Sequence, residues 1–499
     1  MPLASSDRTP HSSAKRYALA DAVRFLLNGE ERAVEGLDPT TTVLEYLRNH
    51  ERRCGTKEGC AEGDCGACTV VLAEANDKGA MSYRAINSCI RFLPTLDGRH
   101  LITVEGVKDP DGTLHPVQRA MVEAHASQCG FCTPGFVMSL FALWHNDKAP
   151  SRETILQALA GNLCRCTGYR PILEAARLMY QGPGEDRFDR EHTVYGRLKR
   201  IGRLTGLQYK AAGKDFFAPR SLGELGEYLR HHPDAMLLAG GTDFGLLVTK
   251  QHKSFKNVVW LGEIAELRTI ATTGSHLEIG CAATWSDALP ALQRYWPNFA
   301  ELVHRFASPP IRNSATIGGN IANASPIGDG APPLIALGAS VVLISLGGER
   351  ELPLEEFFLD YRKTALQRNE IVARLRIPLP EPGLEFAAYK LSKRVDQDIS
   401  AVCAAFAVRI VGGVVSDTRI AFGGMAAIPK RAPAAEAALR GRPWTPPTVN
   451  QAAAALAEDF APIDDFRASA RYRLLTARNL LRRFHLEATG VAGAKIAYG

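Results

Sequence analysis

Cysteines are the residues whose number and spacing most clearly indicate chemistry in this chain. Of the 11 cysteines among 499 residues, nine fall between Cys54 and Cys166. The first twenty residues are polar and have no apolar signal core, so an exported disulfide framework is not expected. We expect a cytoplasmic protein, in which clustered thiols indicate metal binding.

The first cysteine group has the spacing of a plant-type [2Fe–2S] site. Cys60, Cys65 and Cys68 follow the pattern C-x4-C-x2-C, and Cys89 supplies a more distant fourth thiolate. Glycines in this loop leave the backbone free to curl around a cluster. Zinc is the alternative, but zinc sites usually repeat two C-x2-C pairs and this group has one. Cys54 stands at no ligand spacing and is predicted to be a bystander.

The second cysteine group joins two short motifs that lie far apart in the sequence. Cys129 and Cys132 form C-x2-C, whereas Cys164 and Cys166 form C-x-C. Four thiolates fit a second [2Fe–2S] cluster. Zinc remains the alternative here too, although a C-x-C ligand pair is uncommon for zinc.

The elements around the first group predict a small β-grasp domain. Residues 23–27 alternate as a strand, Asn28-Gly29 is typical of a type I′ hairpin turn, and a second strand follows at 32–35. A helix capped by Thr41 or Thr42 and strands at 68–73 and 100–104 complete a ββαββ order. The cluster loop then lies between the helix and the third strand.

The second group is predicted to lie at one end of a four-helix bundle. Helical periodicity covers 117–126, 134–144 and 151–161, and a fourth helix starts near Pro171. In an up-down bundle the loops joining helices one to two and three to four share an end. Those two loops hold all four cysteines, so the four thiols should converge.

Two glycine turns later in the chain indicate a flavin. The apolar strand at 236–239 runs into Gly240-Gly241, and a second turn contains Gly318-Gly319. Such turns can expose consecutive backbone N–H groups to a pyrophosphate. The sequence has no G-x-G-x-x-G pattern, so a Rossmann site is not predicted. A flavin suits a chain with two clusters because it takes electron pairs and passes single electrons.

The order of five motifs resembles that of the iron–sulfur and FAD part of xanthine dehydrogenases, within the molybdenum hydroxylase family. The motifs are GCAEGDCGACTV, SQCGFCTPG, GNLCRCTGYRP, LLAGGTDFG and ATIGGNIANASPIGD. The resemblance covers residues 20 to 490 and implies the small subunit of a bacterial two-subunit enzyme. A large partner subunit would carry molybdopterin and the catalytic site, in an α2β2 heterotetramer. This chain would pass electrons through both clusters to FAD and then NAD⁺ while hypoxanthine and xanthine are oxidised to urate.

The resemblance also assigns site residues, none of them catalytic on this chain. Gln128 would reach the pterin of the partner subunit. The residues that would contact FAD lie on both glycine turns and at four later positions: Leu237, Leu238, Ala239, Gly240, Gly241, Thr242, Asp243, Phe244, Phe306, Thr316, Ile317, Gly318, Gly319, Asn320, Asp329, Val372 and Lys390.

We therefore expect an α+β multidomain chain. The predicted parts are an N-terminal extension (1–20), a β-grasp ferredoxin-like domain (21–106), an all-α four-helix-bundle domain (107–181), a linker (182–214), an α+β FAD-binding domain (215–385) and an α/β C-terminal flavoprotein domain (386–499). Cys281 and Cys403 lie in apolar runs and are predicted to be buried.

Composition limits the other possibilities. A net charge of +6 is mild for this length, so nucleic-acid binding is not indicated. The apolar runs are too short to span a membrane. Two alternatives remain: the small subunit of a related hydroxylase acting on an aldehyde or N-heterocycle, and a redox-sensing iron–sulfur flavoprotein without a catalytic partner.

Overall fold

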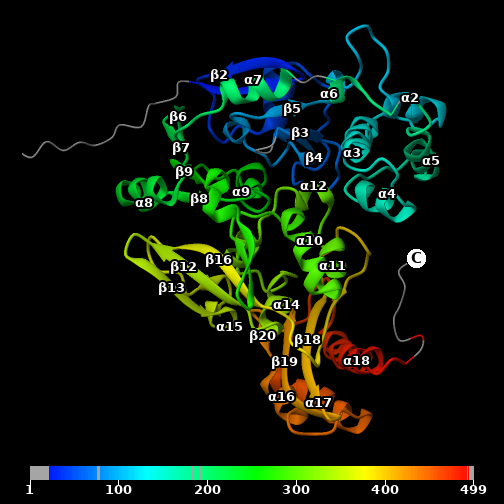
Figure 1. Ribbon diagram of the computed structural model, residues 1–499, viewed down its shortest axis with the longest axis vertical. Coiled ribbons are helices and arrows are strands. Elements are labelled where there is room, and N and C mark those ends of the chain that lie inside the picture. The colour runs from blue at the N-terminus through cyan, green and yellow to red at the C-terminus, as the bar shows by residue number, and fades with distance from the viewer. Residues whose placement is uncertain (1–21, 76–78, 183, 191–192, 492, 494–499) are drawn as a thin grey trace, which may run out of the picture.

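Four regions follow one another along the chain in the computed structural model (Figure 1), which describes residues 22–75, 79–182, 184–190, 193–491 and 493. The predicted extension, residues 1–20, lies outside these ranges. Two small regions lie side by side at one end of the molecule, a larger α+β region forms the middle, and the C-terminal region forms the opposite end. Among the described residues, no helix is long and apolar enough to cross a membrane.

The first region is the predicted β-grasp domain, with one strand more than expected. Its five-stranded sheet has the order β2-β1-β5-β3-β4. Asn28 and Gly29, at φ 52° and 89°, form the predicted hairpin turn between the first two strands. The bounds are β1 Val23–Leu27, β2 Glu30–Val34, α1 Val43–Glu45, a π-helical turn Tyr46–His50, β3 Thr69–Ala75, β4 Met81–Asn87 and β5 His100–Ile102. The predicted ββαββ order was wrong in omitting β4, an edge strand whose mixed sequence MSYRAIN pairs with β3.

The second region is the predicted helical bundle. Its helices are α2 Pro116–Glu123, α3 Thr133–Asn146, α4 Arg152–Leu159 and α5 Arg170–Leu178. Ser151 caps α4, because its side chain accepts a hydrogen bond from the Thr154 amide. Helix α3 is buried along most of its length and packs against both the bundle and the β-grasp sheet. Trp144 and Phe141 are among the largest side chains in this shared core.

The stretch predicted as a linker contains regular structure. It holds α6 Arg187–Arg190, α7 Thr193–Ile201 and β6 Leu207–Ala211. Helix α7 packs on the β-grasp domain, where Val194, Leu198 and Ile201 surround Leu26 of β1. Strand β6 is already the edge of the next sheet, so the middle region of the structure begins earlier than 215.

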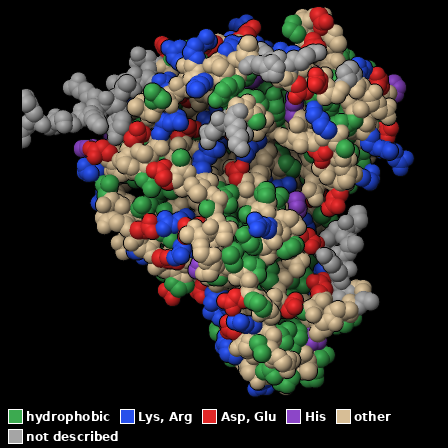
Figure 2. Space-filling view, in the orientation of Figure 1, with side chains coloured by type: hydrophobic (Ala, Val, Ile, Leu, Met, Phe, Trp, Pro, Cys, Tyr) green, Lys and Arg blue, Asp and Glu red, His purple; other side chains and the backbone are tan. Residues whose placement is uncertain are grey.

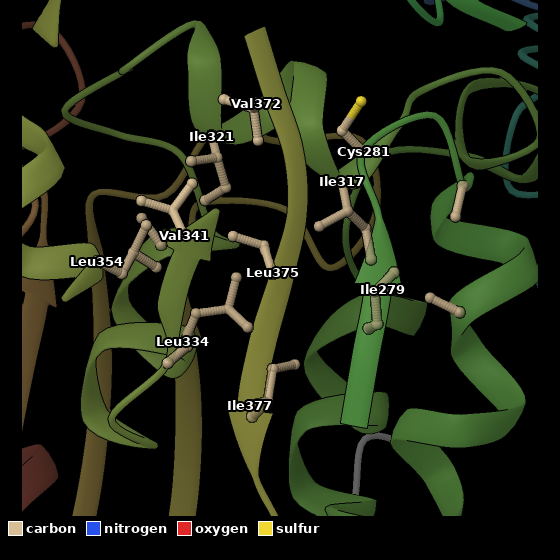
Figure 3. Packing of buried hydrophobic residues seen from close by; sticks show 14 of the residues in the cluster. Ile279, Cys281, Ile317, Ile321, Leu334, Val341, Leu354, Val372, Leu375 and Ile377 are labelled. Atoms are coloured by element: carbon tan, nitrogen blue, oxygen red, sulfur yellow. The ribbon is translucent and has the colours of Figure 1, made fainter. Parts of the chain in front are cut away.

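The middle region has two sheets. The first has the order β6-β7-β9-β8 and carries α8 and α9; the second, β10-β11-β16-β12-β13, is antiparallel. Figure 3 shows Leu375 and Ile377 of β16 between Ile279 on one side and Leu334 and Val341 on the other. The strands are β7 Lys214–Ala218, β8 Met236–Leu238, β9 Asn257–Trp260, β10 Ile270–Thr273, β11 His276–Gly280, β12 Ser340–Ser345, β13 Gly348–Pro353, β14 Phe358–Asp360, β15 Lys363–Thr364 and β16 Ile371–Pro378. The helices are α8 Leu222–His231, α9 Phe244–Thr249, α10 Trp285–Tyr295, α11 Pro297–His304, α12 Pro309–Arg312, α13 Ile317–Ala322, α14 Ala331–Ala336 and α15 Leu354–Phe357.

The C-terminal region packs helices on a four-stranded antiparallel sheet of order β17-β18-β19-β20. The strands are β17 Leu384–Leu391, β18 Val402–Val411, β19 Val414–Gly423 and β20 Lys430–Arg431, and the helices are α16 Pro433–Leu439, α17 Pro446–Asp459 and α18 Ala470–Ala488. Its core joins Phe406 and Phe422 of the sheet to Phe484 of α18. Cys281 and Cys403 are buried, as predicted.

Candidate functional site

The four thiols of the first cysteine group converge in the β-grasp domain. Hydrogen bonds between side chains join Cys60 to Cys65 and Cys89, and Cys68 to Cys89. The amides of Glu62, Asp64 and Cys65 also point at the Cys60 sulfur, at 3.5, 3.3 and 3.4 Å. The hydrogen bonds from the Cys65 and Cys89 side chains and from the amides of Cys65 and Glu62 lower the pKa of Cys60. The sulfur set and its backbone donors therefore fit a [2Fe–2S] cluster.

The second cysteine group converges as the bundle topology predicts. Side-chain hydrogen bonds pair Cys129 with Cys166 and Cys132 with Cys164, across the two loops. Burial and the hydrogen bond with Cys164 raise the pKa of Cys132 to about 12. The Thr167 hydroxyl lies 3.1 Å from the Cys164 sulfur. Cys129 and Cys166 are exposed, whereas Cys68 and Cys89 of the first group are buried.

One hydrogen bond joins the backbones of the two cysteine loops. The amide of Leu163, the residue before Cys164, donates to the carbonyl of Cys65 at 3.0 Å. The buried Asn162 side chain donates to the carbonyl of Gly66 at 3.2 Å and accepts from Ser139 at 2.6 Å. A predicted ligand of one cluster, Cys65, is thus connected to a predicted ligand of the other, Cys164, by a short stretch of backbone and a hydrogen bond.

Gly66 is the residue that permits this contact. Its φ is 71°, and a Cβ built on it would lie 2.1 Å from the Gly161 carbonyl oxygen. A side chain there would push the two loops apart.

The first cluster loop also touches the first glycine turn of the middle region. The Thr249 hydroxyl of α9 donates to the Ala61 carbonyl at 2.9 Å. A Cβ on Gly241 would lie 3.4 Å from the carbonyl oxygen of Ile90, the residue after Cys89. A Cβ on Gly245 would come within 2.8 Å of the Ile90 side chain. The β-grasp cysteines therefore lie next to the first turn.

The first glycine turn has unused hydrogen-bond donors. The amides of Gly240, Gly241 and Thr242 donate to no atom of the described chain. Consecutive free N–H groups with a positive φ at Gly241 (80°) form a backbone anion site that fits a pyrophosphate. The turn thus has the free amides that the sequence predicts, and its binding of FAD stays a prediction.

The second glycine turn differs from the prediction, because its amides are already used. Ile317 donates to Ala283, Gly318 to Cys281, and Gly319 to the Thr316 hydroxyl at 3.1 Å. The expectation of a second backbone cradle was therefore wrong. A Cβ on Gly318 would lie 2.3 Å from the Cys281 Cβ, so that glycine serves core packing. The two turns still meet, since a Cβ on Gly240 would lie 2.0 Å from the Ser314 carbonyl oxygen.

Two of the later predicted FAD residues form a buried ion pair. Lys390 Nζ lies 2.6 Å from Asp329 Oδ2, and Ser400 donates to the other carboxylate oxygen at 2.5 Å. Both charged side chains are almost fully buried, at 3% and 5% exposure. Mutual pairing is what allows two charges to be buried here.

The aromatic and apolar predicted contacts lie in different settings. Phe306 is half-buried against Trp285, with ring centroids 5.2 Å apart. Phe244 packs between Phe92 and Phe255, so its ring belongs to the core shared with the β-grasp domain. Val372 is buried near Ile321 (Figure 3). Their contact with FAD stays a prediction.

Sequence reasoning missed the side chains that hold these segments together. Asn162 joins the two cysteine loops. Arg312 is 5% exposed and donates to the carbonyls of His304, Phe306 and Ala307, at 3.0, 2.8 and 3.3 Å. A polar residue beside a ligand motif, or an arginine in an apolar run, is the only signal that the sequence offered for these positions.

Comparison with known families assigns each region. The matches are "2Fe-2S iron-sulfur cluster binding domain" over residues 25–92, "[2Fe-2S] binding domain" over 103–177, "FAD binding domain in molybdopterin dehydrogenase" over 209–380 and "CO dehydrogenase flavoprotein C-terminal domain" over 387–488. Together with the converging thiols and the free amides, these matches define a chain with two [2Fe–2S] domains and an FAD-binding domain. The chain belongs to the molybdenum hydroxylase family, as an iron–sulfur and FAD chain.

Among relatives of known name, xanthine dehydrogenases are similar over most of the chain. That of Emericella nidulans is 38% identical, over 88% of this chain and 36% of its own length. Xanthine dehydrogenase 1 of Arabidopsis thaliana is 32% identical, over 88% of this chain and 37% of its own length. The chain thus spans about a third of the length of these relatives.

Solved structures of two other enzymes match about half of this chain. A carbon monoxide dehydrogenase chain from Hydrogenophaga pseudoflava is 34% identical, with a TM-score of 0.51, over 54% of this chain and 94% of its own length. A chain of quinoline 2-oxidoreductase from Pseudomonas putida is 27% identical, also with a TM-score of 0.51, over 54% of this chain and 95% of its own.

Proposed function

We propose that this chain is the electron-transfer subunit of a xanthine dehydrogenase. It would receive electrons from a molybdopterin centre on a large partner subunit and deliver them to NAD⁺ in the cytoplasm, within an α2β2 heterotetramer. When bound, the clusters carry single electrons and the FAD exchanges electron pairs with a carrier. The backbone hydrogen bond between Leu163 and Cys65 supports this proposal, because it brings the two cysteine loops into contact.

The protein residues proposed for each cofactor follow from their positions. Cys60, Cys65, Cys68 and Cys89 would hold the cluster beside the flavin, and Cys129, Cys132, Cys164 and Cys166 the other cluster. The free amides of Gly240, Gly241 and Thr242 would bind the FAD pyrophosphate. On the second turn, Thr316 and Asn320 would contribute side chains, since the amides there are occupied.

We place the partner subunit over the exposed end of the helical bundle. Gln128 and Cys129 are exposed at that end, and Phe131 and Leu163 expose 48% and 44% of their surface beside them. Exposed apolar side chains around a redox site favour a protein interface. A cluster at this surface would lie within reach of a cofactor held by another chain.

A second candidate is the corresponding chain of a hydroxylase acting on another substrate. The similarity to chains of a carbon monoxide dehydrogenase and of quinoline 2-oxidoreductase favours it. Both candidates use this chain in the same way and differ in the partner subunit.

Purification with the native partner tests the proposal. We expect a large molybdopterin-containing chain to copurify, and the complex to reduce NAD⁺ when xanthine is added. A complex that oxidises an aldehyde or a heterocycle but neither hypoxanthine nor xanthine would support the second candidate. A chain that purifies alone, with full clusters and FAD, from cells that contain its neighbouring gene products would contradict both.

A further inference from the structure

A charged cavity lies where the β-grasp domain, α7 and the first sheet of the middle region meet. Its volume is about 410 Å³, which is within the roughly 300–1,000 Å³ of small-molecule sites. Arg99 lines it from the β-grasp domain, Lys199 from α7, and Trp260 from the end of β9. No residue of either glycine turn lines it, so the cavity is separate from the proposed FAD site.

Cations outnumber carboxylates in the lining. Among the described residues of the lining, five basic residues face three acidic ones: Arg99, Lys199, Arg203, Arg220 and Arg268 against Glu74, Asp97 and Glu263. Arg99 pairs with Glu74 and Glu263, and Arg203 lies 2.7 Å from Asp97. All three carboxylates are thereby engaged.

Two of the cations, Lys199 and Arg268, are exposed and form none of these ion pairs, although Arg268 acts on Glu74 through space. Lys199 and Arg268 make no ion pair or side-chain hydrogen bond with any described residue. The lining consequently has a formal excess of two positive charges at neutral pH.

Arg99 also shifts the pKa values of two partly buried residues beside the cavity. Burial and the nearby Arg99 lower the pKa of Arg91 to about 10. Burial would raise the pKa of Glu74, but Arg99 outweighs it and brings that pKa to about 2. Arg91 and Arg99 both lie against the Trp260 ring, at 5.3 and 4.9 Å from its centroid. An anion entering the cavity would be attracted by the excess of cations in its lining.

Apolar side chains form a further part of the lining. Leu207 comes from the edge strand β6 and Ala218 from the neighbouring β7, whereas Pro94 comes from the β-grasp domain and Leu198 from α7. The face of the molecule in Figure 2 carries many mixed basic and acidic side chains in its upper half. The cavity therefore combines an excess of two positive charges with an apolar wall.

We propose that this cavity binds a small molecule bearing a diphosphate group, with Lys199 and Arg268 as the residues that contact the phosphates. Two adjacent anionic groups match the charge excess of two, and guanidinium and ammonium groups are strong donors to phosphate oxygens. The apolar wall would accept an attached nucleoside. A bound ligand would bridge α7, the β-grasp domain and the middle region, and so stabilise the arrangement that brings the first cluster loop to the flavin turn.

Isothermal titration of the FAD-loaded holoprotein tests the proposal, with inorganic pyrophosphate, ADP and adenosine as probes. FAD occupies the glycine turn in this preparation, so that turn is not available to pyrophosphate. We expect pyrophosphate and ADP to bind and to raise the melting temperature, and adenosine to do neither. Tighter binding of ADP would assign the apolar wall to a nucleoside, whereas equal affinities would assign the site to diphosphate alone.

Matched variants identify the site. The double variant Lys199→Ala/Arg268→Ala should weaken pyrophosphate binding at least tenfold and keep its FAD and clusters. The control Lys253→Ala/Arg368→Ala removes two exposed cations outside the cavity and should bind like the wild type. If the double variant does not fold, Arg268→Gln and Lys199→Gln should each weaken binding at least threefold. No binding to the wild type, or equal affinity in the cavity and control variants, overturns the proposal.

Discussion

The two cysteine sites hold the same number of thiols but differ in burial and in their neighbours. In the β-grasp site, Cys68 and Cys89 are 1% and 2% exposed. In the helical site, Cys129 and Cys166 are exposed at the surface. The buried site abuts the first glycine turn, whereas the exposed site is surrounded by apolar side chains open to solvent. Cysteine spacing therefore indicates which cofactor binds, and burial indicates what each cofactor can reach.

The largest expected effect comes from removing a ligand of the exposed site. In the complex with the partner subunit, Cys132→Ser should abolish xanthine-driven flavin reduction, because the proposed entry point is lost. NADH-driven flavin reduction should continue at the wild-type rate, because the β-grasp site and the flavin turn are unchanged. Stopped-flow absorbance of the flavin measures both reactions.

Cys54→Ser is the matched control for that experiment. Cys54 is an exposed cysteine outside both sulfur sets, so its replacement should change neither rate. Equal loss of flavin reduction by xanthine and by NADH in a folded Cys132→Ser protein would contradict the assignment of the exposed site to the partner side.

A complete loss of FAD is expected when the turn beside the buried site is altered. Gly241→Val places a side chain at φ 80° among the free amides, close to the Ile90 carbonyl. Released FAD, measured by fluorescence after denaturation, should be absent while both clusters remain. Gly274→Val is the control, because Gly274 has φ 59° and open space around its Cβ in a distant hairpin. Normal FAD in Gly241→Val would mean that the turn does not bind pyrophosphate.

A smaller effect is expected at the junction between the two sites. Asn162→Ala removes two buried side-chain hydrogen bonds, the one donated to the Gly66 carbonyl and the one accepted from Ser139, and should lower the free energy of unfolding by about 1–3 kcal/mol. The magnetic coupling between the two reduced clusters should also weaken in electron paramagnetic resonance. Asn146→Ala removes a comparable 2.7 Å bond between the same two domains, to the Tyr83 carbonyl, and should leave that coupling intact. Equal magnetic coupling in both variants would mean that Asn162 does not hold the two cysteine loops in place.

The smallest expected effect is a pH dependence of stability that arises in the β-grasp domain, which holds the buried cysteine site. Burial lowers the pKa of His100 from 6.5 to about 3, and its Nε2 accepts from the Gly29 amide at 3.0 Å. The unfolded chain binds this proton more readily, so the stabilisation is complete above pH 6.5 and falls as the pH drops toward 3. The loss should approach about 1.4 kcal/mol per pH unit within this window. Urea unfolding at pH 7 and pH 5 measures this loss of stability. His100→Gln should remove this part of the pH dependence. An unchanged pH dependence in the variant would mean that other groups cause it.

Local patterns in the sequence predicted most of the fold around the cysteines. The Asn28-Gly29 turn and the Ser151 cap have the geometry that their residue types favour. The bundle helices were found because their apolar periodicity is strong. Strand β4 was missed because an edge strand with polar positions carries a weak pattern, and its pairing with β3 depends on the tertiary structure.

The sequence predicted which residues are candidate cofactor ligands, but not which residues of the chain contact one another around them. Spacing selected the eight cysteines, and the resemblance selected the flavin residues. Spacing does not show that the amides of Gly318 and Gly319 are already bonded, or that Asn162 lies against Gly66. These facts depend on the approach of segments far apart in sequence, which no local pattern records.

The order of the two sites is tested most directly by supplying electrons from the flavin side. The FAD-loaded chain would be mixed with NADH and freeze-quenched, and the clusters followed by electron paramagnetic resonance, in wild type, Cys132→Ser and Cys65→Ser. In Cys132→Ser, the remaining β-grasp cluster should be reduced at the wild-type rate. In Cys65→Ser, the flavin should be reduced while the helical cluster stays oxidised. Reduction of the helical cluster at the wild-type rate in a folded Cys65→Ser protein would show that the two sites do not act in series.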